Sequence, residues 1–198
     1  MLSTGVPVEK IDPRVLRTRK LLIDAFVSLQ AEKVFDDITI QEIATRATVN
    51  RATFYAHFQD KYDLLDDIIR EGFGETLRRR IGVQPDTTQA HLRHLLLAVI
   101  DHLTSIQNRC QRSFQTFESL VEAQIKKQLR EQVQSWLAAQ PTLRAVPKQR
   151  RELAARLISW SIYGAAFEWL HQAEQQSAEA FAEEALPLIA APITVLGS

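Results

Sequence analysis

Apolar side chains recur at every third or fourth position along most of this chain, which is the spacing of a helix that buries one face. No alternating pattern of a strand persists, and the 6 glycines are too few for a turn-rich β protein. The pattern predicts an all-α fold of about nine helices, with 111–139 forming either one bent helix or two. Further helices are expected near 13–33, 40–47, 51–58, from 61 onward, 88–107, 148–172 and 177–196.

Polar residues that favour helix starts stand directly before four of these segments. Asp12 precedes Pro13, Thr39 and Glu42 have the spacing of a capping box, and Asn50 and Asp60 open the next two helices. The first helix is expected to bury an apolar stripe made by Val15, Leu22, Ala25, Phe26 and Leu29.

The two short helices within 39–58 are separated by the tight turn Ala47-Thr48-Val49, which predicts a helix-turn-helix. Phe54 and Phe58 lie four residues apart and are expected to face the core. At about 100° per residue, Arg51, Ala52, Tyr55 and, less fully, Thr53 are then exposed.

In a helix-turn-helix the second helix enters the major groove of DNA. Arg51 can bind guanine through two N–H donors of its guanidinium. Gln41 can bind adenine through the donor and the acceptor of its side-chain amide. Candidate hydrogen-bond donors to the DNA phosphates are Thr39, Thr53, Tyr55, His57 and Lys61. A small helical core with polar caps is also compatible with these residues.

Charge is unevenly distributed, although 24 Lys and Arg balance 24 Asp and Glu. Residues 14–20 carry Arg14, Arg17, Arg19 and Lys20 without an acid, whereas 157–198 carry Glu but neither Lys nor Arg. A polyanion would therefore bind the N-terminal part, and a solvated helix face is the alternative. Gly72, Gly74, Gly82 and Pro85 suggest a weakened helix end or a hinge. We place the boundary between an N-terminal domain, 1–80, and a C-terminal domain, 81–198.

The segment 157–170 is apolar on nearly all sides, so it must be buried on all sides, by its own domain and by a partner or in the centre of a monomer. We favour a homodimer. Pro187 and Pro192 are expected to kink or shorten the last helix. The candidate dimer residues are Ala165, Ala166, Trp169, Phe181, Leu186 and Ile189.

Large or polarizable residues on the C-terminal helices are candidates for a pocket that takes an unknown small-molecule effector, with core packing as the alternative for each. They are Leu103, Cys110, Phe114, Phe117, Trp136, Trp160, Tyr163 and Phe167. His91, His94 and His102 are expected to face solvent, so we expect no metal and no cofactor. The single Cys, the lack of a secretory signal and the lack of a long apolar run suggest a cytoplasmic protein with no membrane partner.

The N-terminal part resembles tetracycline-repressor-type (TetR) regulators. The similarity lies in 39–44, in 47–58, in Asp60-Lys61 and in Leu64-Leu65, with Thr18-Arg19, Ala25-Phe26 and Phe35 at matching spacing. The resemblance implies a homodimer that binds operator DNA, a variable C-terminal ligand pocket, and a dimer interface built from the last two helices. It implies that Gln41, Arg51 and Ala52 face bases. It also implies that the five candidate hydrogen-bond donors named above bind phosphates.

Two positions depart from the family pattern, Thr48 and Val34, where glycine is usual. A β-branched residue is strained at positive φ, so we expect the turn at Thr48 to adopt another conformation. The resulting prediction is a sequence-specific DNA-binding transcriptional regulator, a repressor released from its operator by a small molecule. The alternatives are a non-specific DNA-binding helical protein and, less favoured, a helical enzyme. G-x-S-x-G, H-E-x-x-H and phosphate-binding glycine motifs are absent from the sequence, so we expect no enzymatic activity.

Overall fold

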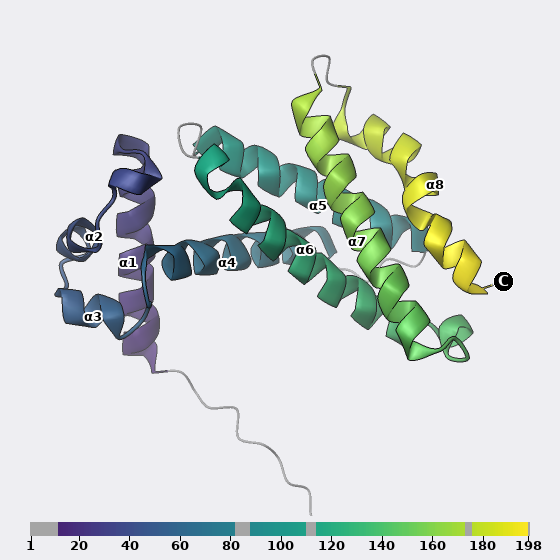
Figure 1. Ribbon diagram of the computed structural model, residues 1–198, viewed down its shortest axis with the longest axis horizontal. Coiled ribbons are helices and arrows are strands. Elements are labelled where there is room, and N and C mark those ends of the chain that lie inside the picture. The colour runs from purple at the N-terminus through teal and green to yellow at the C-terminus, as the bar shows by residue number, and fades with distance from the viewer. Residues whose placement is uncertain (1–11, 82–87, 110–113, 173–175, 198) are drawn as a thin grey trace, which may run out of the picture. The chain divides into compact units, whose positions relative to one another are not determined.

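The computed structural model describes residues 12–81, 88–109, 114–172 and 176–197. This part of the chain is entirely helical, as predicted, and 114–139 forms a single helix, which gives eight α-helices in the described residues. The α-helices are α1 (Pro13–Glu32), α2 (Ile40–Arg46), α3 (Arg51–Tyr55), α4 (Lys61–Ile81), α5 (Thr88–Arg109), α6 (Phe114–Ala139), α7 (Lys148–His171) and α8 (Ala178–Gly197) (Figure 1). Two 3-10 turns, η1 (Phe35–Asp37) and η2 (Pro141–Leu143), complete the set.

Packing divides the chain into two compact units, 1–64 and 65–198. The first turn of α4 belongs to the first unit and the rest of this helix to the second. The functional division at 80 and 81 stays a prediction, and Gly82 and Pro85, which indicated it, lie outside the described residues.

The first unit packs α1, α2 and α3 around aromatic side chains that are completely buried. Phe26 meets Phe35 edge-on with ring centroids 6.0 Å apart, and Phe54 is also fully buried. Val15 differs from the prediction, because the stripe of α1 is covered only from Leu22 onward and Val15 remains 38% exposed.

In the second unit, α7 packs against α5, α6 and α8 (Figure 1). The helix α8 continues through Pro187 and Pro192 to residue 197, so the prolines do not shorten it. Likewise α4 continues through Gly72 and Gly74 instead of weakening there. A Cβ at Gly72 would lie 3.2 Å from Cε1 of His102, so this glycine permits close packing of α4 and α5. None of the helices in the described residues is long and apolar enough to cross a membrane.

Candidate nucleic-acid interface and ligand pocket

A capping box fixes the start of α2, as the sequence predicts. The Thr39 hydroxyl accepts from the Glu42 backbone N–H at 3.2 Å, and the Glu42 carboxylate accepts from the Thr39 N–H at 3.0 Å. Hydrogen bonds from Lys33 and then from Thr39 lower the pKa of Glu42 to about 2. The carboxylate is therefore ionised at neutral pH and keeps α2 capped. On the outer side of α2, Gln41 is exposed and donates to the Thr45 hydroxyl at 3.2 Å.

The turn between α2 and α3 corrects an expectation, because Thr48 adopts a positive φ of 58°. The Val49 N–H donates to the Ala44 carbonyl at 2.9 Å, and the Thr48 N–H donates to the Thr45 carbonyl at 3.1 Å. This pair of bonds is the Schellman arrangement that satisfies the last carbonyls of a helix. Its bonds outweigh the backbone strain of a β-branched residue, so the turn keeps the geometry that glycine would adopt.

The helix α3 is shorter than predicted and ends at Tyr55, although the chain turns onward to place Phe58 in the core. The Asn50 side-chain oxygen accepts from the Thr53 N–H at 2.7 Å and from the Thr53 hydroxyl at 2.9 Å. This cap defines the start of the helix. Arg51, Ala52 and Tyr55 are exposed and Thr53 is half-buried, as the rotation argument predicts.

Arg51 and Tyr55 support each other on the exposed side of α3. The Arg51 Nη2 donates to the Tyr55 hydroxyl at 3.0 Å, and the guanidinium lies 5.6 Å from the centre of the Tyr55 ring. Tyr55 itself is 48% exposed. The contact restricts a long cationic side chain before it binds anything, which reduces the ordering that a ligand must impose.

Lys61 has a role that the sequence did not indicate. Its ammonium donates to three backbone carbonyls, those of Phe35 at 3.0 Å, Asp36 at 2.9 Å and Ile38 at 3.1 Å. It also lies 4.6 Å from the centre of the Phe35 ring. Since an ammonium has three N–H donors, this geometry uses all of them to close η1 and leaves none for a phosphate.

His57 is half-buried, and its carbonyl accepts from Arg19 Nη1 at 3.3 Å. The Arg19 guanidinium also lies 4.5 Å from the centre of the Phe58 ring, so it ties α1 to the end of the α3 segment. Burial, followed by the charge of Arg19, lowers the pKa of His57. A neutral imidazole can contact a phosphate only by donating a single hydrogen bond.

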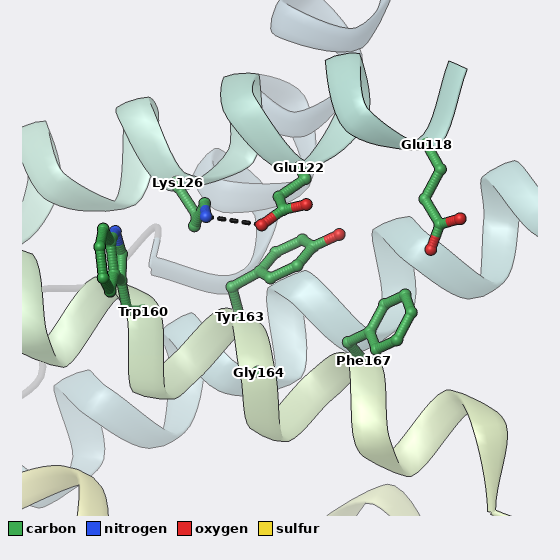
Figure 2. Close-up of a pocket in the computed structure, with 7 residues that line it drawn as sticks. All are labelled: Glu118, Glu122, Lys126, Trp160, Tyr163, Gly164 and Phe167. Atoms are coloured by element: carbon green, nitrogen blue, oxygen red, sulfur yellow. Dashed lines mark hydrogen bonds and ion pairs between the residues drawn. The ribbon is translucent and has the colours of Figure 1, made fainter. Parts of the chain in front are cut away.

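Three of the predicted ligand residues, Trp160, Tyr163 and Phe167, line one pocket of about 330 Å³ between α6 and α7 (Figure 2). The other lining residues, Glu118, Glu122, Lys126 and Gly164, were not predicted from the sequence. The three charged residues follow each other at intervals of four on α6, and such a run is typical of a solvated helix face. This face of α6 lines a pocket only because α7 packs against α6.

The remaining predicted ligand residues lie elsewhere. Leu103, Phe114 and Phe117 are buried in the core of the second unit, because the apolar faces of α5 and α6 close over them. Trp136 stacks on His91 with ring centroids 4.9 Å apart. Cys110 lies outside the described residues.

The predicted dimer residues also divide. Ala166, Trp169, Leu186 and Ile189 are buried within their own unit, and the Trp169 Nε1 donates to the Gln176 carbonyl at 3.0 Å. Ala166, Trp169 and Leu186 pack between helices of the same chain, whereas Ile189 also borders the groove described next. Ala165 and Phe181 instead line an open groove of about 350 Å³ between α7 and α8. Its other lining residues are Ser161, Glu184, Ala185, Leu188 and Ile189.

A family model described as bacterial regulatory proteins of the tetR family matches residues 22–68. The uncharacterized HTH-type transcriptional regulator YxbF of Bacillus subtilis (strain 168) is 37% identical over 83 residues, 39% of this chain and 22% of that protein. The dhaKLM operon transcriptional activator DhaS of Lactococcus lactis subsp. lactis (strain IL1403) is 32% identical over 60 residues, 30% of this chain and 32% of that protein. The chain spans between 22% and 35% of the length of the curated relatives that it matches.

Solved structures share the fold over nearly the whole chain. The TetR transcriptional regulator from Streptococcus agalactiae 2603V has a TM-score of 0.59 at 20% identity and covers 90% of this chain and 96% of its own. RolR in complex with resorcinol has a TM-score of 0.60 at 21% identity and covers 93% of this chain and 95% of its own.

Proposed function

Because a model of the tetR family of bacterial regulatory proteins matches residues 22–68, we propose that the chain is a regulator of this type and that α3 enters the major groove of a specific operator. The observation that carries this proposal is the pair Arg51 and Tyr55, exposed side by side on a short, capped helix behind a tight turn. A guanidinium held in this way can bind guanine through two donors, which gives base specificity.

The other contacts follow from the same orientation. Gln41 and Ala52 face bases together with Arg51, while Thr39, Thr53, Tyr55 and His57 hold phosphates. Lys61 is not part of this proposal, since its donors close η1. The exposed residues Arg14, Arg17 and Lys20 on α1 supply additional positive charge for the backbone of the duplex.

We propose a homodimer formed through the α7–α8 groove. Leu188 is 78% exposed in the single chain, beside Phe181 and Ala165, and a large apolar side chain in that position gains most from a partner. A two-fold dimer also presents two recognition helices to two half-sites about 34 Å apart. Sedimentation should give about twice the chain mass of 22.6 kDa, and a monomer at micromolar concentration would contradict the dimer.

The regulator acts as a repressor that a small-molecule effector releases from its operator. Support comes from the pocket between α6 and α7 and from RolR, whose structure holds resorcinol. DhaS, which is 32% identical over 60 residues, is an activator, so the similarity is compatible with either direction of regulation. Release requires the effector to bind the two states with different affinity, by about 1–3 kcal/mol.

Selection of bound duplexes from a random pool tests sequence-specific binding directly. We expect the pool to converge on two related half-sites in inverted orientation, because a two-fold protein recognises a palindrome. Retention of duplexes without a shared sequence would instead indicate a non-specific DNA-binding protein.

A further inference from the structure

We propose that the pocket between α6 and α7 binds an organic cation, a protonated or quaternary amine attached to an apolar body. The proposal concerns the chemistry of the ligand; only its effect on DNA binding rests on the proposed function. The pocket combines aromatic walls, excess negative charge and one buried hydroxyl (Figure 2).

The aromatic walls come from α7. Trp160, Tyr163 and Phe167 project toward α6, and the Tyr163 and Phe167 rings stack with centroids 6.1 Å apart. Gly164 lies between them and adds no side chain, so the floor stays open. The faces of aromatic rings attract cations, most strongly those of Trp and Tyr.

The charged groups come from α6. Glu118 and Glu122 contribute two carboxylates, and Lys126 contributes one ammonium, so the lining carries a net negative charge. Lys126 binds Glu122 at 2.6 Å, whereas Glu118 forms no ion pair with the residues that the structure describes. One carboxylate thus remains for a cation that comes from outside.

Lys126 already shows how this pocket holds a cation. Its Nζ lies 5.1 Å from the centre of the Trp160 ring and 5.8 Å from that of Tyr163, in addition to the ion pair with Glu122. The lysine stem is long and flexible, so the ammonium can move into solvent. We infer that a ligand cation replaces Lys126 against the same rings and carboxylates.

The Tyr163 hydroxyl adds a polar anchor. Tyr163 is only 6% exposed, and its hydroxyl has no hydrogen-bond partner among the described residues. Burial, and then the charges of Glu122 and Glu118, raise the pKa of this phenol, so it stays protonated. A buried hydroxyl without a partner is costly, and a polar atom of the ligand can satisfy it once the side chains that cover the hydroxyl move aside.

The pocket lies on a different side of α7 from the proposed dimer groove. At about 100° per residue, Trp160, Gly164 and Phe167 share one side, and Ser161 and Ala165 lie about a third of a turn away. A ligand in the pocket and a partner at the groove can therefore be bound together.

Binding of three small probes to the full chain without DNA tests the proposal. The probes are benzyltrimethylammonium as the cation, 2-phenylethanol as the neutral compound and phenylacetate as the anion, followed by calorimetry and by quenching of tryptophan fluorescence. We expect the cation to bind at least about tenfold more tightly than either other probe. Trp160→Phe should remove most of the quenching.

Charge variants separate this site from general binding. Lys126→Met removes the internal competitor and should tighten cation binding about tenfold, whereas Glu118→Gln and Glu122→Gln should each weaken it about tenfold. Glu168→Gln, an exposed change on α7 outside the pocket, is the matched control and should have no effect.

Equal affinity for the three probes, or weaker cation binding by Lys126→Met, would overturn the proposal. Operator binding is measured separately, so a chain that binds the cation but not DNA would contradict only the proposed function. A chain that binds its operator but not the cation would contradict only the ligand class.

Discussion

Thr48 and Lys61 have roles at the residue scale that depend on partners distant from simple sequence patterns. Thr48 takes the positive φ that glycine usually provides, because two hydrogen bonds to α2 hold it there. Lys61 binds the carbonyls of η1, 23 to 26 residues away in the chain. Residue type alone does not distinguish a lysine that binds carbonyls from one that binds phosphate, since both use the same three donors.

Replacing Thr48 with glycine should stabilise the protein by about 1 kcal/mol, because a left-handed conformation costs an L-residue roughly 1–2 kcal/mol and glycine offsets this partly with its flexible unfolded state. Urea denaturation followed by circular dichroism measures the change. Thr45→Gly, within α2, is the control and should destabilise by about 1 kcal/mol. No gain for Thr48→Gly would mean that the turn is unstrained.

Lys61→Met should lower the free energy of unfolding by about 1–3 kcal/mol, since it leaves carbonyls of η1 without their donor. Lys20→Met, at an exposed position, should change it by less than about 0.5 kcal/mol. The salt dependence of DNA binding should keep its slope in Lys61→Met. A slope reduced by about one unit would instead indicate a phosphate contact.

At the element scale, capping residues predicted helix starts well. Asp12, Thr39, Asn50 and Asp60 all accept hydrogen bonds from the first turns of their helices. These signals are local, so the sequence carries them. The early end of α3 and the burial of His91 and His102 on α5 were not predictable in this way, because both depend on which helix packs against them.

Burial of His102 illustrates such packing and corrects the prediction that this side chain faces solvent. It contacts Gly72 and lies 5.3 Å from the Phe73 ring of α4, centre to centre. Burial, and then the charge of Arg109, lowers its pKa to about 4. Burial, and then the charge of His94, likewise lowers the pKa of His91 to about 4.

The stability of the second unit should therefore fall as the pH decreases from about 6.5 to 4. Between these values the unfolded chain binds a proton at His102 that the folded chain does not, so acid favours unfolding. His102→Leu should make the pH dependence shallower, by up to about 1.4 kcal/mol per pH unit. Identical slopes for the His102 variant and the parent would contradict the assignment.

At the scale of the whole molecule, the sequence predicted the all-α class and the helix-turn-helix but only part of the pocket and groove. Trp160 and Phe167 were identifiable as large aromatics, whereas Glu118 and Glu122 became wall residues only through the packing of α6 on α7. Pairings between helices 40 residues apart are not encoded in any local period.

Leu188→Glu should shift the protein from dimer to monomer in sedimentation, because a charge in the α7–α8 groove is costly to bury without a partner. Operator affinity should fall with it, since each half-site alone offers few contacts. Glu179→Gln, an exposed change on the same helix but outside the groove, is the control. If the Leu188→Glu protein remains a dimer, the interface does not lie in this groove.

The central claim, that α3 reads bases through Arg51, is tested most directly by comparing Arg51→Ala with the parent on the selected duplex and on a scrambled duplex. We predict a loss of about 1–3 kcal/mol on the selected duplex, little loss on the scrambled one, and relaxed preference at one base position. Arg14→Ala, which removes an exposed charge of α1, should weaken both duplexes alike. Equal losses on the two duplexes for Arg51→Ala would contradict the account.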